Sequence, residues 1–375
     1  MKRHAQVVGW GKYVPAKVLT NEDLARLVDT SDQWIRERTG ISERRVAAPR
    51  ETTATMAIQA AQEALKVADV DPARLDLIIV ATATPDYAFP SVACLVQDAL
   101  GASRAGAFDL AAGCSGFVYA LATAAQFIQT GAYDTIMVIG AETLSRIVDW
   151  TDRNTCVLFG DGAGAVLLRP NANAGGLLSF VLGADGSGGD LLILPGGGSK
   201  HPASLSTVEE RLHYVKMDGR EVFRFAVNVM GKAAVQAIKA ANLGLGSVDL
   251  LIPHQANLRI IQSAAKSLKL PPEKVFVNLE KYGNTSAASI PIALCEAIEN
   301  GRVKPGDNLV LVGFGAGLTW ASAVLKWGPV AAPVPVPWWK TAWHRMRGRL
   351  YAFRSALIRL WRRVDALLGG GREPG

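Results

Sequence analysis

The chain contains a cysteine, a histidine and an asparagine whose local sequences suit a reactive site. Cys114 lies in a Gly-Cys-Ser turn between a short apolar segment and a long Ala-rich segment. Only a thiolate attacks well, and the N–H groups and dipole of a helix start are expected to lower the pKa of a thiol there. His254 ends the apolar run DLLIPH, and Asn284 opens the run NTSAASIP. A nucleophilic thiol beside two neutral hydrogen-bond donors would suit carbon–carbon bond formation on acyl thioesters, with Cys114 carrying the acyl group.

These residue types also have plainer structural roles. An asparagine at a helix start can be an N-cap, and a histidine at a strand end can be a hydrogen-bonded core residue. The other cysteines, Cys94, Cys156 and Cys295, are expected to be small buried hydrophobic residues.

An internal repeat brings the three candidate residues into relation. The apolar run 75–83 in the first half matches 248–256 in the second, and 134–142 matches 307–315. The spacing from Gly113 to Gly131 equals that from Gly283 to Gly301, which is eighteen residues in each half. Continuous apolar strands alternating with helices indicate α/β sheets covered on both faces. We therefore predict a duplicated body of two halves, 1–172 and 173–327, that places Cys114 and Asn284 in equivalent turns with His254 at a neighbouring strand end.

The charge of the chain is unevenly distributed. The formal net charge is +7, and residues 328–375 hold nine Lys or Arg against two acids, so 1–327 is neutral overall. A neutral body has no basic field for a phosphate backbone, which argues against nucleic-acid binding. The uncharged stretch 110–133 is expected to be a buried helix rather than a membrane span.

Cysteine usage indicates the compartment. The four cysteines are widely spaced and form no CxxC pair, so neither a metal site nor a disulfide framework is expected. We expect a reducing cytoplasm and no metal, nucleotide or redox cofactor.

A papain-like hydrolase is the alternative from another reaction class, because it also uses cysteine, histidine and asparagine in this chain order. The Cys-Gly-Ser-Cys-Trp motif of those proteases is absent. A duplicated body does not suit them either. A non-catalytic acyl-binding protein would be expected to lack one of the three polar residues.

Several motifs together resemble one family. They are TSDQWIRERTGISERR (30–45), AAGCSGF (111–117), FGDGAGA (159–165), HQANLRI (254–260), YGNTSAASIP (282–291) and GFGAGLTW (313–320). The chain resembles β-ketoacyl-acyl carrier protein synthase III, a condensing enzyme of the thiolase superfamily, over about 1–327. The resemblance implies a thiolase-like duplicated αβαβα layered sandwich and a homodimer.

The resemblance also implies an activity. It is the initiating condensation of type II fatty acid biosynthesis, in which an acyl-CoA primer, usually acetyl-CoA, acylates Cys114. Malonyl-acyl carrier protein then loses CO2, His254 and Asn284 stabilise the carbanion, and a 3-oxoacyl-acyl carrier protein forms. Related thiolase-fold reactions remain open: priming of polyketide synthesis, condensation of two long acyl chains, and thiolysis.

Further positions match binding residues of the family. The backbone N–H groups of Cys114 and Ala316 match its oxyanion hole, although the family usually has glycine at the second position. The resemblance implies three more sets of contacts: CoA at Trp34, Arg38, Arg153 and Asn257; the carrier protein at Gln255, Ala256, Asn257, Leu258, Arg259 and Arg224; and the partner subunit's acyl pocket at Phe89.

The segment 328–375 departs from the family. Residues 328–337 are expected to be a Pro-rich linker. Apolar residues then recur at steps of four and three, which predicts a basic amphipathic helix: Trp339, Trp343, Met346, Leu350, Phe353, Leu357, Leu360 and Val364. Such a helix suits an anionic membrane surface, and docking on the body or on a protein partner is the alternative for 338–368.

Overall fold

The computed structural model describes residues 3–171, 175–329, 343, 346, 350 and 353–364. The predicted boundary between residues 172 and 173 lies outside these residues and stays a prediction. Most of the predicted linker 328–337 also lies outside them.

The first half forms a five-stranded sheet. Its spatial order is β1 (His4–Tyr13), β7 (Asp161–Asn171), β6 (Ile136–Thr143), β4 (Leu77–Ala81) and β5 (Gly106–Leu110). β4 runs parallel to β5 and β6, whereas β7 is antiparallel to β1 and β6.

The second half repeats this topology. Its sheet has the order β11 (Leu250–Pro253), β12 (Asn308–Gly315), β13 (Thr319–Lys326) and β8 (Gly176–Ala184). β11 and β12 are parallel, and a parallel bridge between Leu251 and Val275 lies at the position that β5 occupies in the first sheet. The duplication expected from the repeated apolar runs is therefore present in the strand order.

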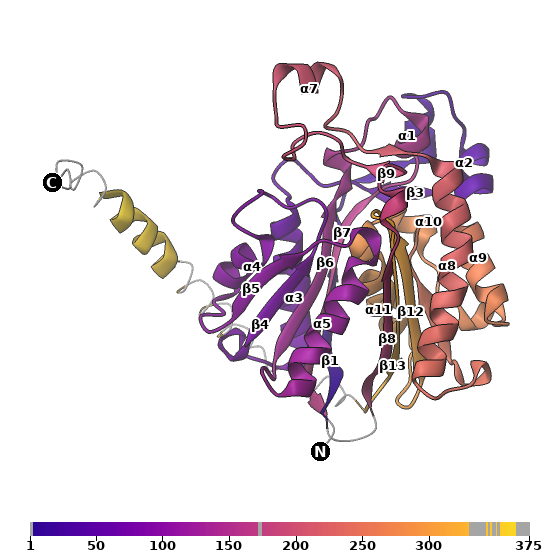
Figure 1. Ribbon diagram of the computed structural model, residues 1–375. Helices are drawn as coiled ribbons and strands as arrows, with labels where there is room; N and C mark the ends of the chain where they lie inside the picture. The colour runs from indigo at the N-terminus through magenta and orange to yellow at the C-terminus, as the bar shows by residue number, and fades with distance from the viewer. Residues whose placement is uncertain are drawn as a thin grey trace.

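Helices form three layers around the two sheets (Figure 1). α3 (Thr53–Ala68) and α4 (Val92–Leu100) pack on the outer face of the first sheet, and α8 (Gly219–Ala240) and α9 (Leu258–Ser267) lie on the outer side of the second. α5 (Gly116–Thr130) and α11 (Ser289–Glu299) lie between the sheets. This arrangement is the predicted αβαβα sandwich.

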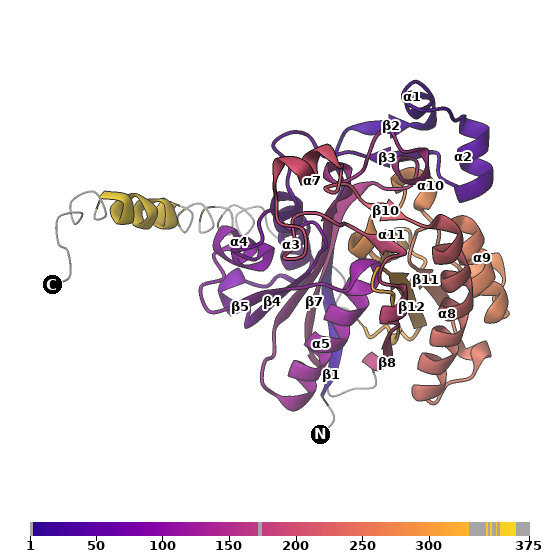
Figure 2. The same cartoon turned by 45° about the horizontal axis from the view of Figure 1, so that its top comes forward.

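The remaining elements are short and lie mainly at one end of the sandwich (Figure 2). They are β2 (Val18–Thr20), α1 (Asn21–Ala25), α2 (Asp32–Thr39), β3 (Glu43–Arg45), α6 (Arg153–Cys156), β9 (Leu192–Ile193), α7 (Leu205–Glu209), β10 (Lys216–Met217) and α10 (Leu279–Tyr282). Among the residues that the structure describes, no helix is both long and apolar enough to cross a membrane.

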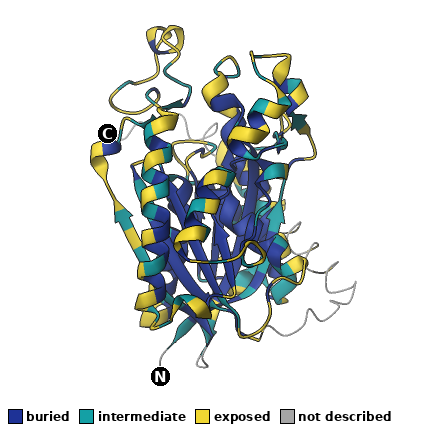
Figure 3. Cartoon of the chain, turned by 90° about the vertical axis from the view of Figure 1, so that its right-hand side faces the viewer, coloured by how far each residue is buried: buried dark blue, intermediate teal, exposed yellow. Residues whose placement is uncertain are grey.

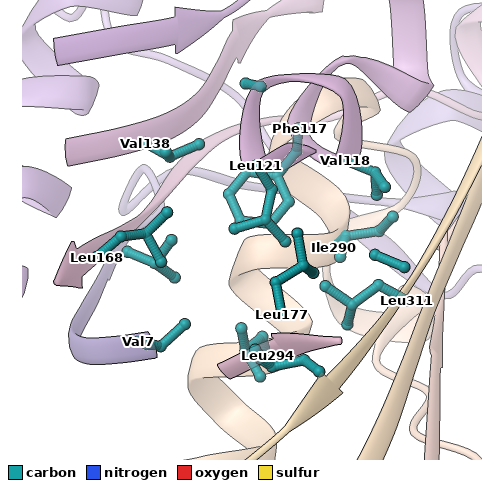
Figure 4. Packing of buried hydrophobic residues seen from close by; sticks show 14 of the residues in the cluster. Val7, Phe117, Val118, Leu121, Val138, Leu168, Leu177, Ile290, Leu294 and Leu311 are labelled. Carbon is teal, nitrogen blue, oxygen red and sulfur yellow. The ribbon is translucent and has the colours of Figure 1, made fainter. Parts of the chain in front are cut away.

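The middle layer explains why α5 and α11 have almost no polar face. Ala, Val, Leu and Phe side chains of α5 contact residues from both sheets, including Val7, Leu177 and Leu311 (Figure 4). Burying one such large side chain contributes about 1.5–3 kcal/mol. The uncharged stretch 110–133 is thus a strand end and a helix whose inward residues lie in the core, whereas Gln126 and residues 129–133 are exposed. Figure 3 shows the buried residues gathered in the sheets at the centre of the molecule.

Close backbone contact holds this centre together at Gly140 of β6. A Cβ atom added there would lie 2.1 Å from the carbonyl oxygen of Ala287. Ala287 belongs to the short 3-10 turn η7 (Ser286–Ala288) that precedes α11. Any larger residue would therefore push the second half away from the first.

We expect Gly140→Ala to lower the free energy of unfolding by about 1–3 kcal/mol, because overpacking a rigid backbone contact costs that much. The matched control is Gly186→Ala, where an added Cβ meets nothing within 4 Å. Denaturant unfolding of both variants measures the difference. Equal stability of the two would show that the contact is not a constraint.

Candidate active site

Cys114 lies in the 3-10 turn η2 (Gly113–Ser115), between the end of β5 and the start of α5. Its exposed fraction is 7%. The end of β12 packs against this turn, because a Cβ on Gly315 would lie 2.4 Å from the Cys114 nitrogen. A Cβ on Gly113 would lie 2.8 Å from the nitrogen of Ala316. The turns that carry the Cys114 and Ala316 amides are therefore in contact.

Burial dominates the acid–base behaviour of the thiol. Burial raises the pKa of Cys114 to about 12, with the neighbouring Ser286 acting to lower the pKa and the negative charge of Glu142 adding to its rise. The prediction of a lowered pKa at a helix start is wrong for this buried thiol. Desolvation outweighs the helix, so the thiol needs a proton acceptor to become a nucleophile.

His254 follows β11 directly and is 1% exposed. Burial lowers the pKa of its imidazole to about 3, so the ring is neutral at physiological pH. Its Nδ1 lies 2.5 Å from the Ser289 hydroxyl, which also accepts the Gln255 N–H at 3.4 Å. That hydroxyl can donate to Nδ1, which leaves the proton on Nε2. Nε2 has no hydrogen-bond partner among the described residues and is available as a donor.

Asn284 is 7% exposed and held by its backbone against the Leu158–Gly160 segment. Its side-chain Oδ1 accepts the Ser286 N–H at 2.8 Å. This bond to the N–H two residues on is an Asx turn. The N-cap positions belong to Thr285 for η7 and to Ala288 for α11, so the N-cap role considered for Asn284 from the sequence is not observed. The Asx turn also fixes the amide plane and leaves the NH2 group free to act as a donor.

Ser286 connects these groups. Its hydroxyl donates to Glu142 Oε1 at 2.9 Å, its N–H donates to Asn284 Oδ1, and its presence beside Cys114 acts to lower the pKa of that thiol. His254 is joined to the next turn through Ser289, the first residue of α11. The structure thus gathers the three candidate residues around one segment, Ser286–Ser289.

Sequence reasoning missed three residues at this site: Glu142, Ser286 and Ser289. Glu142 is a charged residue at the end of the apolar run IMVIGAE, the same signal that singled out His254. The two serines are common hydroxyl residues in an Ala-rich run, and no pattern in the sequence distinguishes them.

The candidate CoA residues form a second cluster. The guanidinium groups of Arg38 (on α2) and Arg153 (on α6) lie 4.8 Å and 5.0 Å from the ring centroid of Trp34. Asn257 donates its side-chain N–H to the Arg38 carbonyl at 2.9 Å and caps α9. These contacts join the four residues in one cluster, and α2 and α9 lie side by side in Figures 1 and 2.

The candidate carrier-protein residues are not equally accessible. Arg224 on α8 and Arg259 on α9 are exposed, and Arg259 stacks over Phe223 at 5.3 Å. Gln255 is 1% exposed and bonds the carbonyls of Pro253 and Phe276, and Ala256 is also buried. Leu258 is half-buried. The exposed part of this set is its arginines.

Phe89, the candidate for the partner subunit's acyl pocket, is 87% exposed and lies in the loop before α4.

Cys156 and Cys295 are buried as expected, but Cys94 is exposed, because it lies on the outward side of α4. The prediction of a buried Cys94 is therefore wrong. In the part of the chain that the structure describes, no group of three or more His, Cys, Asp or Glu residues could hold a metal ion.

Known proteins share this sequence and fold. Residues 108–186 match the family model 3-Oxoacyl-[acyl-carrier-protein (ACP)] synthase III, and 238–327 match the model of its C-terminal part. A β-ketoacyl-[acyl-carrier-protein] synthase III of Desulfitobacterium hafniense is 57% identical over 86% of this chain and 97% of its own. The residues after 327 lie outside both family matches.

Solved structures of this family have the same fold as this chain. The 3-oxoacyl-[acyl-carrier-protein] synthase III of Aquifex aeolicus has 50% identity and a TM-score of 0.80, over 86% of this chain and all of that one. A priming β-ketosynthase of the R1128 polyketide pathway has 37% identity and a TM-score of 0.81, over 88% and 98%. The chain belongs to the β-ketoacyl-acyl carrier protein synthase III family and is an acyl-transferring condensing enzyme.

Proposed function

We propose that the enzyme condenses an acyl-CoA primer, most simply acetyl-CoA, with malonyl-acyl carrier protein. The observation that carries this proposal is the convergence of a buried thiol, a neutral imidazole and an oriented amide on the Ser286–Ser289 segment. The products are a 3-oxoacyl-acyl carrier protein, CO2 and CoA.

The first half-reaction places the acyl group on Cys114. The sulfur attacks the thioester carbonyl, and the negative charge that develops on oxygen is stabilised by the N–H groups of Cys114 and Ala316. The contact between η2 and the end of β12 supports this role, since both amides lie in that contact. Each such donor contributes about 10²–10³ in rate.

The second half-reaction uses His254 and Asn284 as donors. Loss of CO2 from the malonyl group leaves an electron pair that is delocalised onto the thioester oxygen. A neutral Nε2–H and an amide NH2 can stabilise that oxygen without first losing a proton. The carbanion then attacks the Cys114 thioester. Decarboxylation supplies the carbanion and Cys114 accepts the acyl group, so we propose that no cofactor takes part.

Trp34, Arg38, Arg153 and Asn257 are the proposed CoA residues. Aromatic stacking on the adenine and cationic contact with the phosphates fit their chemistry. For the acidic carrier protein we propose Arg224 and Arg259, which are exposed on neighbouring helices. Gln255 and Ala256 are buried, and we propose that they support the loop between β11 and α9.

We also propose a cytoplasmic homodimer. Phe89 is 87% exposed and Tyr87 on the same loop is 60% exposed, and such a pair of aromatic side chains suits insertion into a partner subunit. The proposed destination of Phe89 is the partner subunit's acyl pocket.

The C-terminal helix 353–364 is proposed to contact an anionic membrane surface. Its apolar residues are exposed: Phe353, Leu357, Leu360, Trp361 and Val364. Arginines occupy neighbouring positions. Charge complementarity with anionic lipid favours that surface over a neutral one. Ser355 and Arg359 bond Asp98 of α4, so the helix stands beside the body (Figure 1).

Cys114→Ser should abolish transfer of the acetyl group from radiolabelled acetyl-CoA to the protein, because the acceptor sulfur is lost. The matched control is Cys94→Ser, which removes an exposed thiol outside the site and should label normally. Labelling of the Cys114 variant at the wild-type level would remove this residue from the mechanism.

Asn284→Asp and Asn284→Ala should both accept the acetyl group but condense about 10²–10³-fold more slowly, because each lacks the NH2 donor. The aspartate variant keeps an acceptor for the Ser286 N–H, so it separates loss of the donor from loss of the turn. Mass spectrometry of the acyl-enzyme and of the 3-oxoacyl product measures the two steps. Undiminished condensation by either variant contradicts the role.

The pair of changes Leu357→Asp and Leu360→Asp should reduce sedimentation of the full chain with anionic vesicles, because both remove exposed apolar contacts. The control is Asp98→Ala, which breaks the contact with α4 and should leave vesicle binding intact or increase it. Equal sedimentation of wild type and the double variant contradicts the membrane contact. A change of sedimentation in Asp98→Ala alone would likewise show that the helix docks on its own body instead.

A further inference from the structure

Arg44 is a fully buried cation that the proposed half-reactions do not use. It lies on β3, at the end of the sandwich that carries α1 and α2 (Figure 2). Burial lowers the pKa of its guanidinium to about 10, which leaves the group charged at pH 7. Its hydrogen bonds in the described part of the chain go to neutral oxygens, and its Nε has no partner there. A buried charge held in this way is costly, so its value lies in what those oxygens position.

One side of the guanidinium supports α2. Nη1 and Nη2 of Arg44 both donate to Asn21 Oδ1 at 2.9 Å. Asn21 is itself fully buried, and its Nδ2 donates to Asp32 Oδ1 and to the Ile41 carbonyl, both at 2.8 Å. Asp32 is the first residue of α2, and Ile41 lies just beyond its last turn. Through one asparagine side chain, Arg44 therefore holds both ends of the helix that carries two of the four proposed CoA residues.

The other side of the guanidinium supports α6. Nη2 of Arg44 donates to the carbonyl of Val157, the C-cap residue of α6, at 2.8 Å. Arg153, the first residue of α6, lies over the Trp34 ring and donates to the Asp29 carbonyl at 2.7 Å. A single guanidinium thus joins the two helices that must face each other for the proposed CoA residues to form one cluster.

The segment that follows α6 also holds the catalytic asparagine. The Leu158 carbonyl accepts the Asn284 N–H at 2.8 Å, and the Gly160 N–H donates to the Asn284 carbonyl at 3.0 Å. A Cβ atom added at Gly160 or Gly283 would lie 3.2 Å or 3.3 Å from the Arg44 Cβ, so the stem of Arg44 packs against both sides of this backbone contact. Arg44 therefore fixes the CoA cluster relative to the backbone that carries Asn284.

The chemistry of CoA gives this link a purpose. Its thioester and its adenosine phosphates lie at opposite ends of a long, flexible pantetheine arm. Binding at the phosphate end assists reaction at the thioester only when the two sites stand at a fixed separation. We infer that Arg44 is a positioning residue for acyl-CoA, which ties α2 to α6 so that the phosphate end is held at one place relative to the reacting thiol. This inference rests on the proposed CoA residues.

The test compares two acetyl donors that differ at the phosphate end. Acetyl-CoA carries the adenosine phosphates, whereas acetyl-pantetheine has the same thioester and arm without them. We expect Arg44→Lys and Arg44→Gln to raise the acetyl-CoA concentration that half-saturates acylation of Cys114 by about tenfold, which corresponds to about 1.4 kcal/mol of binding free energy. The maximal rate with acetyl-CoA and the second-order rate constant with acetyl-pantetheine should stay at their wild-type values. Lysine keeps the charge but lacks the planar fork that reaches Asn21 and Val157 together.

Three results would overturn the inference. Equal losses with both donors would show that Arg44 supports the protein in general rather than the CoA cluster. An unchanged half-saturating concentration in both variants would show that the link is not needed. Full activity of Arg44→Lys beside a loss in Arg44→Gln would show that the charge matters and the fork does not.

A pair of variants nearer the surface decides the question if the Arg44 variants fail to fold. Asp32→Ala removes the last step of the path from Arg44 through Asn21 to α2, and it should also weaken saturation by acetyl-CoA but not reaction with acetyl-pantetheine. The matched control is Arg36→Ala, which removes the ion pair with Asp32 and leaves that path intact. It should saturate as wild type does. Equal behaviour of the two variants contradicts the inference.

The inference and the proposed CoA residues can fail separately. Arg153→Ala tests the cluster directly, and normal saturation of this variant by acetyl-CoA contradicts the cluster and the inference together. If Arg153→Ala weakens saturation while the Arg44 variants do not, only the inference is wrong. Arg44→Lys combined with Arg153→Ala should cost less than the product of the single losses, because both act on one cluster.

Discussion

The packing of η2 against η7 between the two sheets is the contact on which the rest of the structure depends. Two glycines flank this contact: Gly140 of β6 packs against η7 and Gly315 of β12 packs against η2, and at each a single added carbon would strike the backbone opposite. The two halves therefore approach each other closely enough for the turn that carries Cys114, from one half, to contact the turn that carries Ser286, from the other. Neither half contains a complete site, and the duplication is what creates one.

A dry contact of this kind fixes the electrostatics. Burial opposes the charged form of every group inside it, so the thiol stays protonated and the imidazole neutral. A neutral imidazole can donate to a developing oxyanion but cannot easily serve as a base. The same desolvation that makes His254 a good donor also raises the pKa of the buried Glu142 carboxyl, which hydroxyl groups of Ser286 and Thr84 hold by hydrogen bonds.

The architecture could be predicted from the sequence because repeated apolar runs and equal glycine spacings report directly on a duplicated α/β body. Cys114, His254 and Asn284 could be found because polar residues in apolar surroundings are conspicuous. Ser286 and Ser289 could not, since their importance comes from hydrogen bonds to Glu142 and His254 across 144 and 35 residues of chain, which no local pattern contains. The pKa of Cys114 was predicted in the wrong direction because a motif reveals the helix start but not the depth of burial.

The burial of Cys114 also bears on the durability of the enzyme. Oxidants such as peroxides react with exposed thiolates, and a thiol that is 7% exposed and has a pKa of about 12 offers them little of either property. The residue that the chain presents to such damage is Cys94, on the outer surface of α4 and away from the chemistry. A nucleophile that is buried and protonated in the free enzyme is in this way protected from oxidative inactivation.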